Sequence, residues 1–352
     1  MKTGKSLSEL AQEIQRQQET KKDYIADTRK IHMTCSTPDN SPQLDIEGVD
    51  SLQKITDNCH AQFADRLKIP KGYYDRMRND YPELLVDNVN GWLKKNPAKR
   101  LVRTLDGNAR AFLSDRYRPL DNFDFLENTL PILSDNGCDI VSCEVTDNRL
   151  FVKALIPKVE GEIEKGDIVQ SGIVLSNSEV GAGSLRVEPL IYRLACLNGM
   201  IAESALKKYH LGKSNGNGDD DKIYQLLHDD TKAQTDKALW MQVRDIVESA
   251  FKVDIFNAYL EKLRSATLDK IGADPIKVIE KVKKTYSLSD GEKTSILTHL
   301  IQGGSLTRYG LANAITRTAN DLDDYHRATE FERLGGKIIE LPKSDYQVLT
   351  CN

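Results

Sequence analysis

The clearest chemical signal in the sequence is a run of basic residues with aromatic side chains among them. Between Trp92 and Leu120 there are eight lysines and arginines but only two aspartates, so this stretch carries +6 while the whole chain carries −4. Single-stranded nucleic acid is commonly held in this way, by cations that follow the phosphates and rings that stack on bases. The candidate binding residues, with Phe112 and Tyr117 as the stacking rings, are Lys94, Lys95, Lys99, Arg100, Arg103, Arg110, Phe112, Arg116, Tyr117 and Arg118.

Two of these arginines predict something more specific. Arg103 and Arg110 flank an Asp106-Gly107 turn, and pairing across that turn would place them opposite each other. Two like charges facing each other destabilise a sheet unless an anion lies between them. Either a phosphate of the ligand supplies that anion, or the basic stretch pairs with the acidic remainder of the chain. The second possibility describes a structural or host-interaction protein.

A second group of polar residues lies in "SNSEVGAGSLRVEP", residues 176–189. The stretch has neither the lysine of a phosphate-binding loop nor a helix after its glycines, because strand character resumes at Ser184. We therefore interpret Gly181-Ala182-Gly183 as a hairpin turn. Its neighbours form a candidate polar cluster of unknown role if they share one face of the sheet: Asn177, Glu179, Arg186 and Glu188.

Other catalytic and metal-binding patterns are missing from the sequence. There is no HExxH, CxxC or GxSxG, and the six cysteines show no repeated spacing, which predicts reduced thiols. The acidic run "EGEIEKGD" (160–167) lacks the (D/E)xK pattern of metal-dependent nucleases. We assign no catalytic residue, metal or cofactor, and we keep an enzyme with an unrecognised nuclease-like carboxylate site as an alternative.

A helix-turn-helix pattern precedes the basic stretch. From Phe63 to Met77 a small residue, Ala64, stands at the expected helix crossing, and Pro70 opens the second helix. The segment 60–78 thus supports another alternative, a regulator that binds duplex DNA. The second helix offers few cations for that purpose: Lys71, Arg76 and Arg78.

The elements around these residues predict an α+β fold. Strand patterns at 99–105, 109–114, 139–145, 149–156, 167–180 and 184–195 indicate a curved, mainly antiparallel sheet with covering helices, followed by a helical C-terminal region. The expected organisation is a polar N-terminal arm (1–30), a helical segment with the helix-turn-helix-like corner (31–92), an α+β sheet core (93–210), a flexible linker (211–222), a helical region (223–340) and a tail (341–352).

Several segments together resemble a known family. They are "FLSDRYRPLDNFDFLENTLPIL" (112–133), "SNSEVGAGSLRVEPLIYRLACLNGM" (176–200), "YGLANAITRTANDLDDYHRATEFERLGG" (309–336) and "IPKGYYDRMRNDYPELLVDNVNGWL" (69–93). They look like the phage/plasmid-like proteins of domain of unknown function family 932. The resemblance implies a phage- or plasmid-encoded protein in a bacterial host and favours DNA metabolism, but it supplies no catalytic residues. The basic hairpin sheet is also similar in architecture to phage single-strand annealing proteins.

The resulting hypothesis is a non-enzymatic nucleic-acid-binding protein in phage or plasmid DNA metabolism, including recombination or annealing. Single-stranded DNA is the favoured partner, and the C-terminal helices are expected to support a homo-oligomer. A polar N-terminus and the lack of any long apolar run predict a cytoplasmic protein with no membrane partner.

Overall fold

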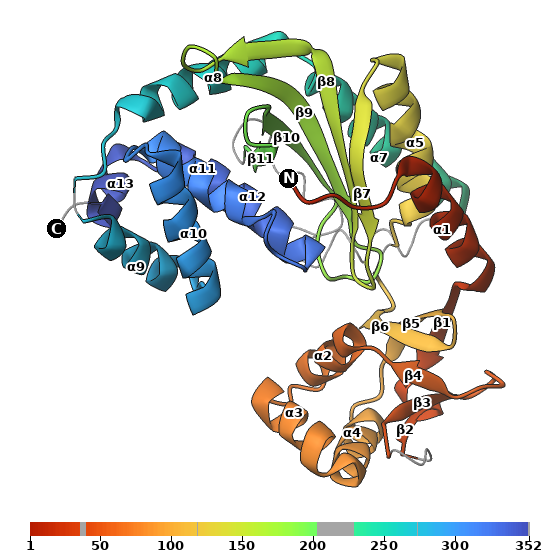
Figure 1. Cartoon of the computed structure of the whole chain (residues 1–352). Helices are drawn as coiled ribbons and strands as arrows, with labels where there is room; N and C mark the ends of the chain where they lie inside the picture. The colour runs from red at the N-terminus through yellow and green to blue at the C-terminus, as the bar shows by residue number, and fades with distance from the viewer. Residues whose placement is uncertain (36–39, 118, 203–228, 273, 351–352) are drawn as a thin grey trace.

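The computed structural model describes residues 1–35, 40–117, 119–202, 229–272 and 274–350. Within them the chain forms two sheets, with helices packed against both (Figure 1). This arrangement confirms the predicted α+β class, a curved and mainly antiparallel sheet followed by C-terminal helices. None of the helices in the described ranges is both long and apolar enough to cross a membrane.

The smaller sheet has six strands in the order β1-β5-β6-β4-β3-β2. All neighbours pair antiparallel except β4 and β6. Asp106 and Gly107 join β5 to β6 with positive φ angles of 51° and 74°, as a tight hairpin turn requires. The elements are β1 (Lys22–Asp27), the 3-10 turn η1 (Thr28–Lys30), β2 (Ile31–Thr34), β3 (Gln43–Ile46), β4 (Gln53–Ile55), α2 (Asp57–Arg66), α3 (Lys71–Asp80), α4 (Pro82–Lys95), β5 (Lys99–Leu105) and β6 (Asn108–Ser114).

The larger sheet has five antiparallel strands in the order β11-β10-β9-β8-β7. Its middle strands are buried on both faces, because helices cover both sides of the sheet (Figure 1). Helices α5 and α7 pack on one face, and α11 and α12 lie against the other. The elements are α5 (Asn122–Asp135), β7 (Asp139–Val145), β8 (Leu150–Glu162), β9 (Ile168–Asn177), β10 (Arg186–Arg193), β11 (Asn198–Ile201) and α7 (Asp229–Ser249).

The remaining helices form the C-terminal region around an apolar core that includes Leu263, Val282 and Ile315. They are α8 (Val253–Leu268), α9 (Pro275–Tyr286), α10 (Asp290–Gly303), α11 (Arg308–Thr318), α12 (Tyr325–Glu340) and α13 (Lys343–Thr350).

Three segments differ from the elements that the sequence predicts. The N-terminal 1–30 is an ordered part of the fold: α1 (Leu7–Thr20) buries Leu10 and Ile14, and β1 pairs with β5. The first part of 31–92 is strand and not helix. The prediction missed β2, β3 and β4 because they have only three or four residues each, too few for their alternation to reveal a strand. The 341–352 tail contains α13, which packs on α9. The linker at 211–222 lies outside the described residues.

Two ion pairs hold α12 against the larger sheet. Lys153 of β8 contacts Glu332 at 2.6 Å, and both side chains are 0% exposed. Beside them Arg333 makes a two-pronged contact with Glu188 of β10, its Nη2 lying 2.6 Å from Oε2. Burying a charge is costly unless it is paired, so each partner requires the other. These pairs fix which residues of α12 face the sheet.

Removing one partner of the fully buried pair should destabilise the protein strongly. Lys153→Met leaves the Glu332 carboxylate buried without its cation, and we expect the free energy of unfolding to fall by about 3–5 kcal/mol. The double variant Lys153→Met/Glu332→Leu should lose less, because no unpaired charge remains. Urea unfolding measures both, with Lys158→Met on the exposed end of β8 as the control. Wild-type stability in Lys153→Met would contradict the argument.

Candidate nucleic-acid interface

The structure divides the predicted basic residues into buried and exposed groups. Arg103 belongs to the first, since only 2% of it is exposed. Its guanidinium contacts Asp23 at 2.8 Å and Asp121 at 2.7 Å, and it donates to the main-chain oxygen of Glu179 at 2.6 Å. Burial alone would lower its pKa, but the carboxylates of Asp121 and Asp23 outweigh burial and raise it. Arg103 is therefore a permanently charged, internally paired residue.

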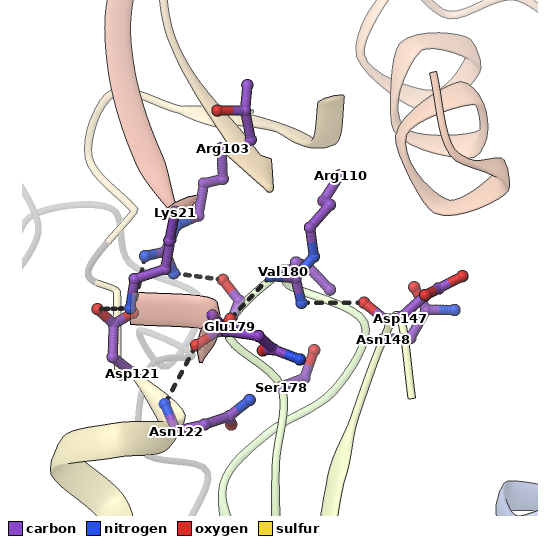
Figure 2. A network of polar contacts seen from close by, with 12 residues as sticks. Lys21, Arg103, Arg110, Asp121, Asn122, Asp147, Asn148, Ser178, Glu179 and Val180 are labelled. Carbon is purple, nitrogen blue, oxygen red and sulfur yellow. Dashed lines mark hydrogen bonds and ion pairs between the residues drawn. The ribbon is translucent and has the colours of Figure 1, made fainter. Parts of the chain in front are cut away.

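Arg110 is buried in the same network (Figure 2). Its Nη1 lies 2.9 Å from Oε1 of Glu179, and its Nη2 donates to the main-chain oxygen of Asp147 at 3.2 Å. The other carboxylate oxygen of Glu179 accepts the backbone N–H of Asn122 at 3.1 Å. Glu179 is itself only 3% exposed, and its carboxylate neutralises Arg110, whereas Asp23 and Asp121 neutralise Arg103. The two arginines are not directly opposite each other as predicted, because an irregularity in the hairpin pairs Arg103 with Ala111. The chain thus supplies a separate set of anions for each arginine.

A neighbouring aspartate completes this network. Asp121 accepts from Arg103 and from Lys21, whose Nζ lies 2.7 Å away (Figure 2). Burial raises the pKa of the Asp121 carboxyl, but the two cations more than offset burial and the net shift is downward. The network thus joins β1, β5, β6 and the start of α5 through paired charges.

Phe112 and Tyr117, the two rings predicted to stack on bases, are not exposed as that role requires. Phe112 is fully buried and stacks on Phe63 of α2, with ring centroids 4.0 Å apart. Tyr117 is partly buried, and its hydroxyl donates to the main-chain oxygen of Ser178 at 3.3 Å. The ring of Phe112 therefore belongs to the core of the smaller sheet, where no base can reach it.

The other basic residues gather at the far end of the β5–β6 hairpin. The pairing of Arg100 with Ser114 places the start of β5 beside the residues that follow β6. The end of α4 leads directly into this region, which lies opposite the Asp106-Gly107 turn. We call the resulting group the cation patch: Lys94, Lys95, Lys99, Arg100 and Arg116. Arg118 lies outside the described residues.

The cation patch differs from the buried arginines in having no carboxylate partners. None of its five side chains forms an ion pair with any residue that the structure describes, whereas Arg103 and Arg110 do. Arg100 is half-buried, and its Nε has no hydrogen-bond partner in the described structure. Burial and the neighbouring charge of Arg66 lower the pKa of Arg100, partly opposed by Asp115. Positive charge is thus in excess here.

An aromatic residue that the sequence analysis does not single out lies within this region. Trp92 of α4 is 39% exposed, and the Nζ of Lys95 lies 5.9 Å from its ring centroid. The three-residue spacing of the two, one helical turn, is the signal that could have identified the pair. Trp92 therefore provides the exposed ring that Phe112 does not.

The predicted polar cluster at 176–189 is split between two faces of the larger sheet. Asn177 points toward α5, where its amide donates to the main-chain oxygen of Leu120 at 2.7 Å and to Asn122 at 2.9 Å. Arg186 and Glu188 point toward the opposite side, where Glu188 pairs with Arg333 of α12. The predicted cluster is therefore two separate pairs: Asn177 and Glu179 both contact Asn122, and Arg186 lies 3.8 Å from Glu188 on the other side. The glycines between them join β9 to β10, which agrees with the predicted hairpin.

The helix-turn-helix-like corner is formed by α2 and α3. It is closed by a buried 2.8 Å hydrogen bond between Nδ1 of His60 and the Tyr74 hydroxyl. Each cation of its second helix is close to a carboxylate: Lys71 lies 2.7 Å from Asp75, Arg78 lies 2.7 Å from Asp57, and Arg76 lies 3.7 Å from Asp80. The exposed face of α3 therefore carries little unpaired positive charge.

Comparison with known families matches most of this architecture. A family model described as Domain of unknown function (DUF932) matches residues 111–321. The chain belongs to this family. The matched part includes Glu179, the larger sheet and the helices through α11. Comparison with curated proteins and with solved structures gave no match.

No group of three or more His, Cys, Asp or Glu side chains in the described part of the chain is placed to hold a metal ion. The candidate interface is therefore the cation patch together with Trp92, supported from behind by the buried arginine network.

Neutralising the carboxylate at the centre of that network should destabilise the fold. Glu179→Gln keeps the shape of the side chain but leaves Arg110 buried without a counter-charge, so we expect the free energy of unfolding to fall by about 2–4 kcal/mol. Urea unfolding measures the loss. Glu127→Gln, on the exposed side of α5, is the matched control and should change it by less than about 0.5 kcal/mol. Equal stability of the two variants would argue against the network.

Proposed function

We propose that this protein binds nucleic acid, with single-stranded DNA as its preferred partner, through the cation patch and Trp92. The observation that supports this proposal is the gathering of five cations without carboxylate partners in the described structure beside an exposed indole. Like charges that lie close together repel one another, and a polyanion relieves that repulsion. The indole face offers sequence-independent stacking to an unpaired base.

The proposal assigns a different role to Arg103 and Arg110. Both form ion pairs with carboxylates of the chain, so they stabilise the hairpin and do not contact phosphates. Lys99, Arg100 and Arg116, at the end of the hairpin opposite the turn, remain available for phosphates. Of the ten residues predicted from the sequence, the proposed interface keeps the five of the cation patch.

A preference for single strands follows from the type of groups available. A partly exposed tryptophan can stack on a base only where that base is not already stacked within a duplex. Reading of duplex DNA by α3 would need unpaired cations on that helix, and its cations lie beside Asp57, Asp75 and Asp80. A regulator that uses α3 is therefore the less favoured alternative, and a duplex substrate distinguishes the two.

The biological setting and the assembly are further parts of the proposal. We infer a role in phage or plasmid DNA metabolism, such as strand annealing, which would use protein copies side by side along one strand. Self-association through the C-terminal helices remains a prediction of this proposal; the apolar side chains available there include Leu268, Ile276, Ile301 and Val348, each more than 60% exposed.

Charge removal within the cation patch should weaken DNA binding specifically. The variant Lys95→Gln/Lys99→Gln/Arg116→Gln should bind a fluorescent single-stranded oligonucleotide at least tenfold more weakly in anisotropy titrations. Because each single-strand phosphate contact contributes about 0.7 to the dependence of log K on log salt, that slope should fall by about 2. Lys277→Gln/Lys284→Gln/Lys343→Gln removes the same charge from exposed positions elsewhere and should bind nearly as wild type.

Two results would overturn the proposal: no binding of single-stranded or duplex DNA at low salt, or equal weakening by the two triple variants. A strong preference for duplex, lost in Arg76→Ala and kept in the patch variant, would instead support the α3 regulator.

The role of Trp92 can be measured through its own fluorescence. The chain has two tryptophans, and the other, Trp240, packs against Phe125 with ring centroids 6.4 Å apart. Oligonucleotide binding should quench the emission of the wild-type protein, and Trp92→Leu should remove the quenching and weaken binding about 5- to 100-fold. Equal quenching in Trp240→Phe serves as the control. Quenching that persists in Trp92→Leu would exclude Trp92 from the interface.

A further inference from the structure

A second basic region forms a pocket on a different part of the molecule. The pocket has a volume of about 320 Å³ and lies between the beginning of β8, the beginning of β10 and helix α12. That volume is near the lower end of the range for small-molecule sites. Its positively charged and imidazole lining residues are Arg149, Arg186, His326, Arg327, Arg333 and Lys337, and Glu330 also lines it.

Some of these charges are already neutralised within the chain. Arg333 is paired with Glu188, and Arg327 contacts both Glu292 and Glu330. Arg186 lies 3.8 Å from the same Glu188 that Arg333 holds more closely. The carboxylates around the pocket are thus shared or committed.

Arg149 is the arginine of this pocket whose charge is not neutralised by a carboxylate of the described structure. Its guanidinium donates to the main-chain oxygen of Ala182 at 2.6 Å and forms no ion pair with the residues that the structure describes. Burial lowers its pKa, and the nearby positive charges of Arg333 and Arg186 lower it further. Glu330 and Glu188 act in the opposite direction, but they pair with Arg327 and Arg333 and not with Arg149. A half-buried guanidinium beside other cations and without an ion pair of its own is costly unless an anion joins it.

The glycine-containing hairpin loop explains how Arg149 is held. A Cβ at Gly183 would lie 2.8 Å from Cζ of Arg149, so the guanidinium occupies the space that any larger residue would fill. The carbonyl of Ala182 fixes one of its nitrogens from the same loop. The guanidinium is therefore positioned before any ligand arrives, and such preorganisation lowers the entropic cost of binding.

His326 adds a further polar group to the wall of the pocket. It lies beside the Phe151 ring, with centroids 6.0 Å apart. Burial and the charge of Arg149 lower its pKa, while Glu330 and Asp324 act in the opposite direction. A negative ligand near Arg149 would favour the protonated form and add one more donor.

We propose that this pocket binds a phosphate group, held by the guanidinium groups of Arg149 and Arg186, with Lys337 at its exposed rim. Planar guanidinium groups present paired N–H donors that match the oxygens of a phosphate. The pocket shares no residue with the cation patch, and the proposal does not rest on DNA binding. Its ligand is a phosphate, either free or on a small molecule, or the terminal phosphate of an oligonucleotide.

Calorimetric titration with inorganic phosphate tests this site directly. At constant ionic strength, wild-type protein should bind one phosphate saturably. Chloride at the same concentration should not displace it. Arg149→Gln should bind at least tenfold more weakly. Arg244→Gln removes the same charge from an exposed position on α7 and should bind as wild type. Adenosine monophosphate and oligonucleotides with and without a 5′-phosphate, titrated in parallel, identify which source of phosphate the pocket prefers.

A charge-neutral variant separates a built site from general electrostatic attraction. Gly183→Ala leaves the net charge unchanged but pushes a methyl group into the place of the Arg149 guanidinium, so phosphate binding should weaken at least fivefold. Circular dichroism and thermal unfolding confirm that the variant is folded. No phosphate binding beyond that of chloride, or wild-type binding by folded Arg149→Gln and Gly183→Ala, would overturn the proposal.

The tests distinguish a failure of the phosphate-pocket proposal from a failure of the DNA-binding proposal. Loss of phosphate binding in Arg149→Gln with normal oligonucleotide binding supports the pocket as an independent site. The cation-patch triple variant should keep full phosphate affinity, and a parallel loss there would contradict the assignment to Arg149.

Discussion

The arrangement of the two sheets depends on the ion pair and hydrogen bonds that Glu179, a buried carboxylate, makes with residues of the smaller sheet and of α5. Glu179 follows β9 of the larger sheet, and its carboxylate accepts from Arg110 of the smaller sheet and from the backbone N–H of Asn122 at the start of α5. Its main-chain oxygen accepts from Arg103 of β5 (Figure 2). A buried charge cannot be left unpaired without large cost, so these contacts hold the hairpin against the larger sheet in one position.

The same network determines which basic residues remain for a ligand. Arg103 and Arg110 lie toward the turn of the β5–β6 hairpin, where Asp23, Asp121 and Glu179 neutralise them. At the other end of the hairpin, Asp27 lies opposite Lys99 but pairs with Arg29, and Asp115 lies near Arg100. None of the patch cations forms an ion pair with a described residue, so the positive charge of the basic stretch is concentrated there. An unevenly charged sequence has thus become a neutral, buried junction and a separate charged surface.

The sequence predicts those features that depend on local patterns. Asp106-Gly107 identifies the hairpin, and the apolar runs separated by turn residues identify the strands of the larger sheet. It does not predict β4, which has three residues, or the partners of Arg103, which lie about 80 residues before it and 18 after it. Arg149 gives no signal either, because a lone arginine beside a turn acquires its meaning only from the glycine that it packs against.

The hairpin loop between β9 and β10 shows why a glycine-containing sequence can be required without being a phosphate loop. On one side, the main-chain oxygen of Val180 accepts from Gln62 and Asn58 of α2, and Gly181 has a φ of 74° and lies where a Cβ would meet Leu113. On the other side, Gly183 accommodates the guanidinium of Arg149. Each glycine therefore permits a close approach, the first to the smaller sheet and the second to an arginine. Under the phosphate proposal, the loop serves the anion by positioning that arginine and not by presenting its own amides.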